Sequence, residues 1–310
     1  MRQEPSIPNR YIGGMRVALL LALCCCACQR ESKELPAPNE QRLPISITCT
    51  PGAQDTRATD TAFDDGDQVG LYVVTHSSTT QPTLLSSGNY ADNVRFTYQG
   101  TWASTQPLYW QDNHTHADFY LYYPYAAQMP DVHHWHVAVP ADQSTPSAMR
   151  QADVLVGRAS DVAPTQEAVR IIARHMMSRL TVKLQAGRGF TDEQLRDARV
   201  AVSLGGLSTE ATVDLATATA TASSEATQSI TPCCTDALTY TATVAPQEVP
   251  AGDLVTITVN GDRYTLHRAI TLKAGTSHHA TVTLDKGSGS VSVAIDDWAT
   301  DGKDYGGTAQ

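Results

Sequence analysis

Short runs of alternating apolar and polar residues recur along most of this chain and restrict it to a β-fold. Ile45, Ile47 and Cys49 alternate with polar residues, which is the pattern of a half-buried strand. Similar runs predict strands at 69–74, 94–98, 119–123, 134–139, 169–172, 180–184, 200–204, 255–259, 264–266, 282–284 and 291–295. Turn residues separate them at intervals of roughly 8–12 residues, and no βαβ alternation is present. We therefore expect an all-β protein made of two tandem antiparallel β-sandwiches.

Two local motifs predict specific connections within the second half of the chain. Asn260-Gly261 supplies two residues that tolerate positive φ, as a tight type I′ hairpin turn requires. Thr191 and Gln194 have the spacing of a capping box, which predicts one short helix over residues 192–199. The Thr- and Ala-rich stretch 211–228 is expected to be partly a loop.

The composition of the 310-residue chain changes near residue 165, which suggests a domain boundary. We expect a first sandwich domain at 43–165 and a second at 166–310. Residues 29–42 contain a Pro-rich, polar stretch and are expected to be a tether. Residues 1–28 are expected to be a targeting segment rather than part of the fold.

The targeting segment has the features of a bacterial lipoprotein signal. Arg16 precedes an apolar run that is too short to span a bilayer, and polar residues follow Cys28 at once. Cys28 comes directly after the small residue Ala27, so we expect signal cleavage before Cys28 and acylation of its thiol, for example with palmitate. Cys24 is the rival acylation site. The alternative to a lipoprotein signal is an ordinary secretory signal. Met1 and Met15 are both candidate start residues.

Charge and cysteine content exclude several other classes of protein. Asp and Glu total 32 against 22 for Lys and Arg, giving a net charge of −10 that disfavours binding to nucleic acid. Of the seven cysteines, Cys49, Cys233 and Cys234 would remain in the mature chain. An odd number with two adjacent members is not a disulfide framework.

A search for catalytic chemistry finds no nucleophile elbow, zinc-protease, P-loop or dinucleotide motif. We therefore expect neither enzymatic activity nor a cofactor. His114 and His116, and likewise His134 and His136, would project from one face of a strand and are candidate zinc or copper ligands. No carboxylate or cysteine completes a defined metal spacing, so polar loop and strand-end positions are the alternative. The acidic residues around Gly66 do not fit an EF-hand loop, and they predict a solvated turn or a calcium site.

Several blocks of sequence, taken in order, resemble one known family. The blocks are Phe63–Asp67 with Val69–Tyr72, Trp102, Pro107–Trp110, Asp118–Tyr125, Asp153–Val156, His175–Leu184 and Ile295–Trp298. Together they resemble fimbrillin-like proteins, the pilus subunits of Bacteroidales-type bacteria. The resemblance runs from about Arg57 to Trp298.

The resemblance implies two transthyretin-like β-sandwich domains, export as a lipoprotein, and polymerisation by strand exchange at the outer surface. Its implied partners are other pilus subunits and, through the lipid, the outer membrane. The residues after Trp298 are Gly-rich and polar, unlike an alternating donor strand, so shaft, anchor, tip and accessory roles stay open. The alternative is a surface lipoprotein that binds a glycan or host ligand as a monomeric β-sandwich module.

In fimbrillin-like shaft subunits a protease removes the first strand after lipidation, and two basic residues flank the first strand here. Cleavage after Arg42 would leave Ile45, Ile47 and Cys49 in place, whereas cleavage after Arg57 would release the whole strand. Arg57 is therefore the expected maturation site. An uncleaved anchor subunit, in which Arg57 is a solvated loop residue, is the alternative.

Overall fold

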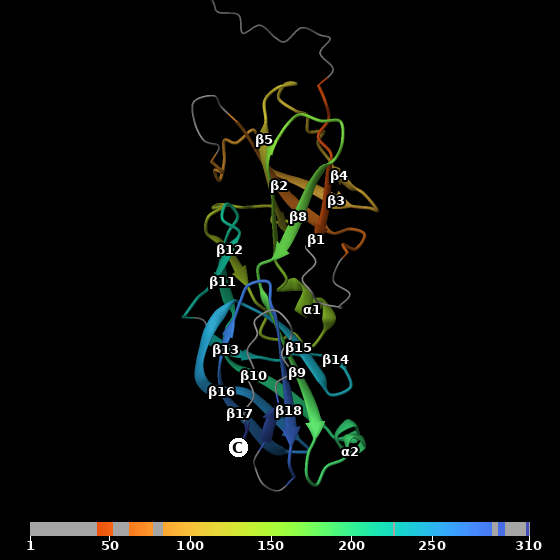
Figure 1. The fold of residues 1–310 in the computed structure, drawn as a ribbon, viewed down its shortest axis with the longest axis vertical. Coiled ribbons are helices and arrows are strands. Elements are labelled where there is room, and N and C mark those ends of the chain that lie inside the picture. Colours follow the sequence, from red (N-terminus) through yellow and green to blue (C-terminus); the bar gives the residue numbers. More distant parts are fainter. Residues whose placement is uncertain are drawn as a thin grey trace, which may run out of the picture. The chain divides into compact units, whose positions relative to one another are not determined.

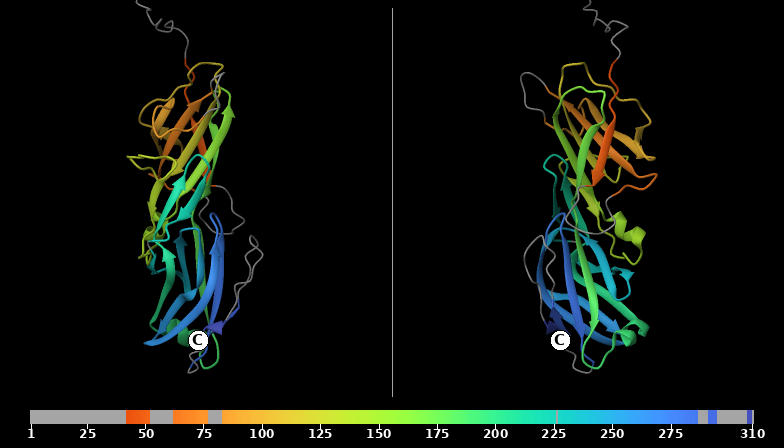
Figure 2. Two further views of the ribbon diagram at one scale, coloured as in Figure 1. Left: turned by 90° about the vertical axis from the view of Figure 1, so that its left-hand side faces the viewer. Right: turned by 45° about the vertical axis from the view of Figure 1, so that its right-hand side comes forward.

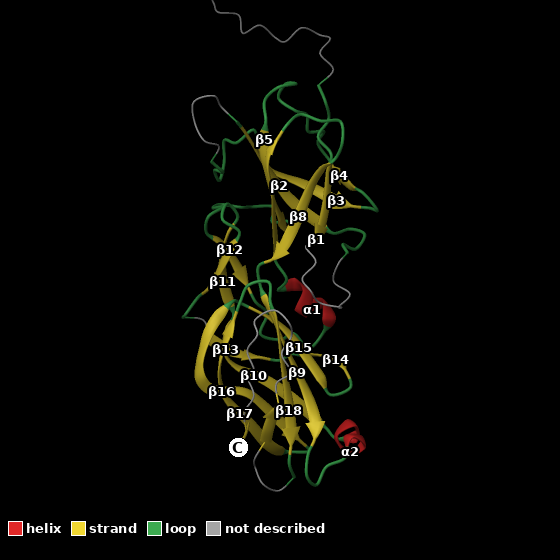
Figure 3. Ribbon diagram, in the orientation of Figure 1, coloured by secondary structure: helices red, strands yellow, loops and turns green. Residues whose placement is uncertain are grey.

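The computed structural model describes residues 42–51, 62–76, 83–225, 227–286, 291–294 and 308–309. Cys24, Cys28, Arg57 and the Ile295–Trp298 block lie outside the described residues. Residues 42–310 form one compact unit, and strands dominate its described part, with two short helices (Figure 3). The all-β prediction is therefore confirmed. None of the described helices is long and apolar enough to cross a membrane.

The first sheet has seven strands in the order β1-β8-β7-β5-β2-β3-β4 (Figure 1). Their bounds are β1 Ile47–Pro51, β2 Gln68–Thr75, β3 Ala91–Tyr98, β4 Trp102–Ser104, β5 Ala117–Tyr123, β7 Leu155–Val162 and β8 Val169–His175. All neighbours are antiparallel except β1 and β8, which are parallel. The sheet is antiparallel as predicted except at this one pair, which the sequence did not indicate, because alternation along a strand carries no information about the direction of its partner.

Both faces of this sheet are covered, which explains why β2 and β5 are almost continuously buried. One face holds Leu71 and Phe119 in a first apolar cluster. The other holds Tyr122, whose ring packs edge-on against Trp135 with the ring centres 5.0 Å apart. Trp135 belongs to a three-stranded sheet, β12-β11-β6, with β6 Trp135–Ala138, β11 Glu210–Asp214 and β12 Thr219–Ala222.

The later strands form two further sheets that enclose a second apolar core (Figure 2). One has the order β13-β10-β16-β17, with β10 Val200–Ser208, β13 Thr227–Ile230, β16 Gln247–Val259 and β17 Asp262–Leu272. The other has the order β14-β15-β9-β18-β19-β20, with β9 Ser178–Ala186, β14 Cys233–Asp236, β15 Thr239–Val244, β18 Ser277–Leu284, β19 Val291–Ala294 and β20 Thr308–Ala309. Here β9 and β18 are parallel.

Local sequence signals explain where the two helices begin and where one tight hairpin turn forms. Helix α2 (Asp192–Asp197) begins at the predicted capping box, in which the Thr191 and Gln194 side chains each bond the other's backbone N–H. A second helix, α1 (Pro146–Gln151), was not predicted, although Thr145 before a proline is an N-cap signal. Asn260 and Gly261 join β16 to β17 with φ of 52° and 103°, which confirms the predicted hairpin.

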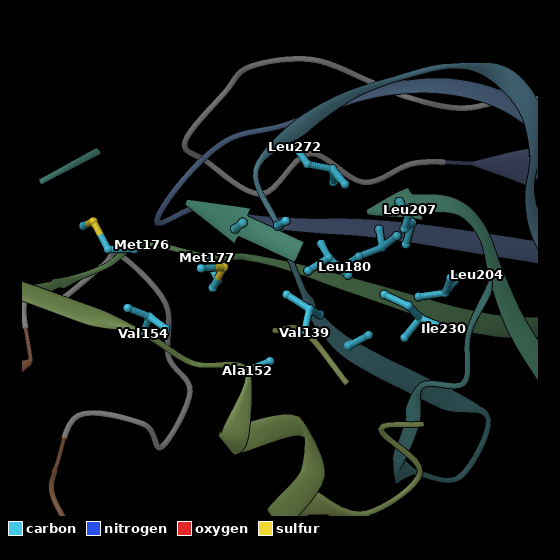
Figure 4. Close-up of a cluster of buried hydrophobic side chains, with 14 of the residues drawn as sticks. Val139, Ala152, Val154, Met176, Met177, Leu180, Leu204, Leu207, Ile230 and Leu272 are labelled. Carbon is cyan, nitrogen blue, oxygen red and sulfur yellow. The ribbon is translucent and has the colours of Figure 1, made fainter. Parts of the chain in front are cut away.

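The expected boundary at residues 165–166 precedes β8, yet β8 pairs with β7 in the first sheet. The stretch 211–228, expected to be partly a loop, contains β11, β12 and the start of β13, with turn and loop residues between them at 215–218 and 223–225. Strand β11 pairs with β6. Figure 4 shows Met176 and Met177, between β8 and β9, packed within the cluster that holds Leu180 and Leu207. We propose that the two sandwich regions divide at Met176–Met177, across this shared apolar cluster.

Replacing Asn260 by Val is expected to lower the free energy of unfolding by about 1 kcal/mol or more. A β-branched residue resists the positive φ that this turn position requires, and the Asn260 Oδ1 that accepts from Arg199 N–H would also be lost. Urea unfolding of both proteins measures the difference. An unchanged midpoint would contradict the importance of the turn.

Candidate assembly site

The N-terminal strand segment, residues 43–51, is hydrogen-bonded along both of its edges. On one edge Ile45 N–H donates to Leu108 O at 2.8 Å, and Trp110 N–H donates to Leu43 O at 2.9 Å. On the other edge β1 runs parallel to β8 in a five-residue register from Ile47 opposite Val169 onwards. The segment therefore fills a gap between β8 and the 108–110 segment.

The inward side chains of this segment contribute to the first apolar cluster. Ile45, Ile47 and Cys49 are 6%, 3% and 7% exposed. The cluster they join also contains Trp110 and Phe119, whose ring centres lie 5.5 Å apart. Side chains alternate along a strand, so the intervening Thr48 is exposed. Each fully buried aliphatic side chain of this size stabilises the fold by roughly 1.5–3 kcal/mol.

The reactivity of the Cys49 thiol depends on whether β1 is in place. Burial raises the pKa of Cys49 to about 12, although a hydrogen bond from the Ala173 backbone opposes the shift. Because the thiolate is the reactive species, Cys49 is expected to be inert towards thiol reagents while β1 is in place. Cys233 and Cys234 are also free thiols, and Cys234 is exposed.

Removal of residues 43–51 would leave an opening between the two segments that they now join. Without residues 43–51, β8 and the 108–110 segment would each present backbone groups to a shared opening. The floor of that opening would be the apolar cluster now covered by Ile45, Ile47 and Cys49. An apolar groove with hydrogen-bonding edges binds an extended strand that carries apolar residues at alternate positions.

The Phe63–Tyr72 block contains the turn that leads into β2. Gly66, with φ of 97°, makes the turn before the strand, and Asp67 accepts from the Asp64 N–H at 2.8 Å and the Tyr123 O–H at 3.2 Å. The acidic cluster is thus used as a turn among the described residues, as one of the two sequence interpretations expected. Gly70 lies against the ring of Tyr122, its partner across β2 and β5.

A buried carboxylate network, not anticipated from the sequence, ties together β2, β5 and β7. Asp118 is 2% exposed and accepts from His76 Nε2 at 2.9 Å, Arg158 Nη2 at 2.6 Å and Asp161 N–H at 2.8 Å. Burial alone would raise the pKa of Asp118, but these hydrogen bonds outweigh it and hold the pKa below the ordinary value. The Asp161 carboxylate extends this network, because its Oδ1 lies 2.7 Å from His116 Nδ1.

Replacing Asp118 by Asn is expected to lower the free energy of unfolding at pH 7 by about 2 kcal/mol, because the charge-assisted bonds to Arg158 and His76 are lost. A depressed folded pKa gives stability that is present above the unfolded pKa of about 3.9 and is lost as pH falls through the folded pKa. The wild-type and variant proteins should therefore differ less at about pH 3 than at pH 7. Urea unfolding at both pH values measures the two free energies of unfolding. If wild type and Asp118→Asn differ by the same amount at about pH 3 and at pH 7, the ionised Asp118 carboxylate does not stabilise the fold in this way.

The four candidate metal-binding histidines are found with separate surroundings. His116 contacts Asp161, whereas His134 Nδ1 lies 2.9 Å from the Asp131 carboxylate. His136 is exposed on β6, and the His114 N–H donates to Asp112. Within the described ranges, no group of three or more His, Cys, Asp or Glu side chains is arranged to hold a metal ion.

Sequence comparison finds relatives among proposed fimbrium subunits. The chain is 27% identical over 295 residues to the proposed fimbrium subunit Fim1C of Bacteroides uniformis, covering 91% of this chain and 93% of that protein. A proposed fimbrium tip subunit of Bacteroides ovatus is 27% identical over 205 residues, which are 58% of this chain and 36% of that protein.

Two crystal structures of proposed cell adhesion proteins have a similar fold. The one from Bacteroides uniformis has a TM-score of 0.64 and 22% identity, covering 85% of this chain and 100% of that chain. The one from Bacteroides ovatus has a TM-score of 0.65 and 17% identity, covering 83% and 96%. A family model described as fimbrillin-like matches residues 56–298. Because that match spans most of the chain, the protein belongs to the fimbrillin-like family.

Proposed function

We propose that this protein is a structural subunit of a cell-surface fimbrium that contributes to adhesion. In this proposal it is exported as a lipoprotein, held at the outer membrane through Cys28, and assembled by strand exchange after cleavage following Arg57. Its partners are other fimbrial subunits. Its task is mechanical and adhesive rather than catalytic.

The observation that carries the proposal is the seating of residues 43–51. The segment is hydrogen-bonded on both edges and buries Ile45, Ile47 and Cys49. This supports the proposal that a strand from another subunit takes its place. Arg57 follows β1 in the sequence, before the next described residues at 62–76. Cleavage there would separate the whole segment from the rest of the fold.

The relatives support this role and leave the position in the fimbrium open. One is named a proposed fimbrium subunit and another a proposed fimbrium tip subunit. An uncleaved chain would remain joined to its lipid and act as an anchor. A cleaved chain could join the polymer.

The strand-exchange proposal is testable by cleaving the folded protein at a chosen place. Residues 54–57 are replaced by the recognition sequence of a specific protease, and the purified folded protein is then cut. We expect concentration-dependent oligomers that appear as a ladder in mild denaturant, because the freed groove takes up a strand from another molecule. The matched control carries the same recognition sequence at 36–39, where cleavage leaves residues 43–51 attached.

The Cys49 thiol supplies a second readout of the same experiment. It should resist maleimide in the uncut protein and in the control, and react once the 43–51 segment has left the groove. Ladders that form equally after either cut would contradict strand exchange through this groove. A protein that stays monomeric after release of the segment would do so as well.

Replacing Cys28 by Ser is expected to move the protein from the membrane fraction to the soluble fraction. Each buried acyl CH₂ contributes about 0.8 kcal/mol to membrane binding, so loss of the acyl chains removes the anchor. Fractionation followed by immunoblotting measures the shift. Retention of the Cys28→Ser protein, together with release by Cys24→Ser, would assign the acylation to Cys24.

A further inference from the structure

The outward face of β7 and β8 forms a shallow groove of about 650 Å³ that has no part in the proposed strand exchange. Three arginines line it: Arg158 on β7, and Arg170 and Arg174 on β8. Ile172 lies between the two β8 arginines, and Ala218 from the turn between β11 and β12 also lines the groove. In Figure 1, β8 lies beside β1. The groove is on the side of β8 away from the first apolar cluster, because its lining residues on β8 alternate with the buried Val169, Ile171 and Ala173 of that cluster.

The strand register brings these residues together. Arg170, Ile172 and Arg174 alternate with buried residues on β8, so they share its outward face. Arg158 on β7 is the antiparallel partner of Ile172. At a rise of about 3.3 Å per residue, Arg170 and Arg174 are roughly 13 Å apart along the strand, with Arg158 across from the midpoint.

The groove concentrates positive charge on a chain whose net charge is −10. Arg170 and Arg174 form no ion pair with any residue that the structure describes. Arg158 is held in place by Asp118 at 2.6 Å, and its guanidinium lies 4.8 Å from the centre of the Tyr120 ring. Gathering like charges weakens a sheet rather than stabilising it, so the fold itself does not account for the arrangement.

The ligand class follows from what the groove offers. Arginine guanidinium groups recognise carboxylate and sulfate groups through paired hydrogen bonds. Strands β7 and β8 are paired on both sides, in the order β1-β8-β7-β5, so the groove has no strand edge to bind the backbone of a peptide. Ile172 is 48% exposed at the centre and offers an apolar contact.

We propose that this groove, hereafter the arginine groove, binds an acidic polysaccharide that carries carboxylate or sulfate groups along its length. Repeating acidic groups match the row formed by Arg170, Arg158 and Arg174, and apolar faces of the sugar rings contact Ile172. The groove lies on the outward face of β8, so binding does not depend on whether β1 has been exchanged. The site goes beyond the assembly role and would give a fimbrium its adhesive ligand.

The test uses the full-length uncut protein and two acidic oligosaccharide probes, one carrying uronate groups (oligogalacturonate) and one carrying sulfate groups (a chondroitin sulfate oligosaccharide). Titration calorimetry measures Kd at low and at raised NaCl. We expect binding of at least one acidic probe, weakened by salt because the contacts are exposed ion pairs. Neutral dextran should not bind.

The variant Arg170→Gln/Arg174→Gln should bind at least about tenfold more weakly, as expected when two charge-assisted contacts are removed. Its matched control, Arg196→Gln/Arg263→Gln, makes the same change of charge at exposed positions on α2 and β17 and should bind like wild type. Thermal melting checks that all variants are folded. Ile172→Ser should weaken binding several-fold without any change of charge.

Three outcomes would overturn the proposal. The first is an absence of binding to both acidic probes at low salt. The second is an equal loss of binding in the matched control, which would indicate a general charge effect. The third is tighter, groove-dependent binding of a polyglutamate peptide than of either oligosaccharide, which would assign the arginine groove to an acidic protein.

Discussion

Replacing Ile47 by Asp is expected to lower the free energy of unfolding by more than about 3 kcal/mol. Ile47 is 3% exposed and lies in the apolar cluster of the first sheet. The change removes a buried aliphatic side chain and places a carboxylate where no partner is available, and both effects destabilise. Urea unfolding of the uncut protein measures the loss.

The matched control for this prediction is Thr48→Asp, one residue along the same strand. Thr48 points outward and pairs with Arg170 on β8, so the same carboxylate should change stability by less than about 0.5 kcal/mol. Equal effects at the two positions would contradict the observed alternation of β1. A small effect at Ile47 would mean that the fold does not depend on the seated strand.

Replacing Gly70 by Ala is expected to cost about 3 kcal/mol, a large effect for one added methyl group. A Cβ at Gly70 would lie 2.1 Å from Cε1 of Tyr122. The Tyr122 ring has little freedom to move, because its O–H donates to Asn93 Oδ1 at 2.7 Å and its edge packs on Trp135. Thermal and urea unfolding measure the cost.

Two further variants decide whether this cost comes from the Tyr122 ring. Gly252→Ala should change stability by less than about 0.5 kcal/mol, because the nearest atom to its added Cβ is Pro250 O at 3.8 Å. In a double-mutant cycle, Gly70→Ala should be better tolerated in a Tyr122→Ala background, where space is available. An unchanged cost in that background would exclude a clash with the ring.

Features decided by a few neighbouring residues could be predicted from the sequence. The Asn260-Gly261 turn needs two residues with positive φ, and the Thr191–Gln194 box satisfies backbone groups within a single helical turn. Alternating burial likewise follows from the local geometry of a strand. These signals require no knowledge of which segments pair.

Features that depend on distant pairing could not be predicted in this way. The parallel pairing of β1 with β8 joins segments more than a hundred residues apart, and no local pattern encodes it. The hairpin of β11 and β12 joins β6 for the same reason, and the composition change near residue 165 gave no sign that β8 belongs to the first sheet.

The candidate sites also combine features that the local sequence indicates with features that depend on the pairing of distant strands. Ile45, Ile47 and Cys49 could be recognised as one face of a strand, but the two hydrogen-bonded edges around them become visible only when Leu108 and Val169 are placed beside that strand. The Asp118 network and the arginine groove likewise combine residues of separate strands. Their sequence signal is limited to polar residues within otherwise apolar strands.

The central claim is that the protein enters a fimbrium after losing its first strand. N-terminal sequencing of the protein recovered from purified fimbriae tests it most directly. The account predicts a sequence that begins at Ala58, with residues 43–51 absent from the assembled material. A blocked, lipidated N-terminus in the assembled fimbriae would contradict strand exchange at this groove and make the protein an anchor.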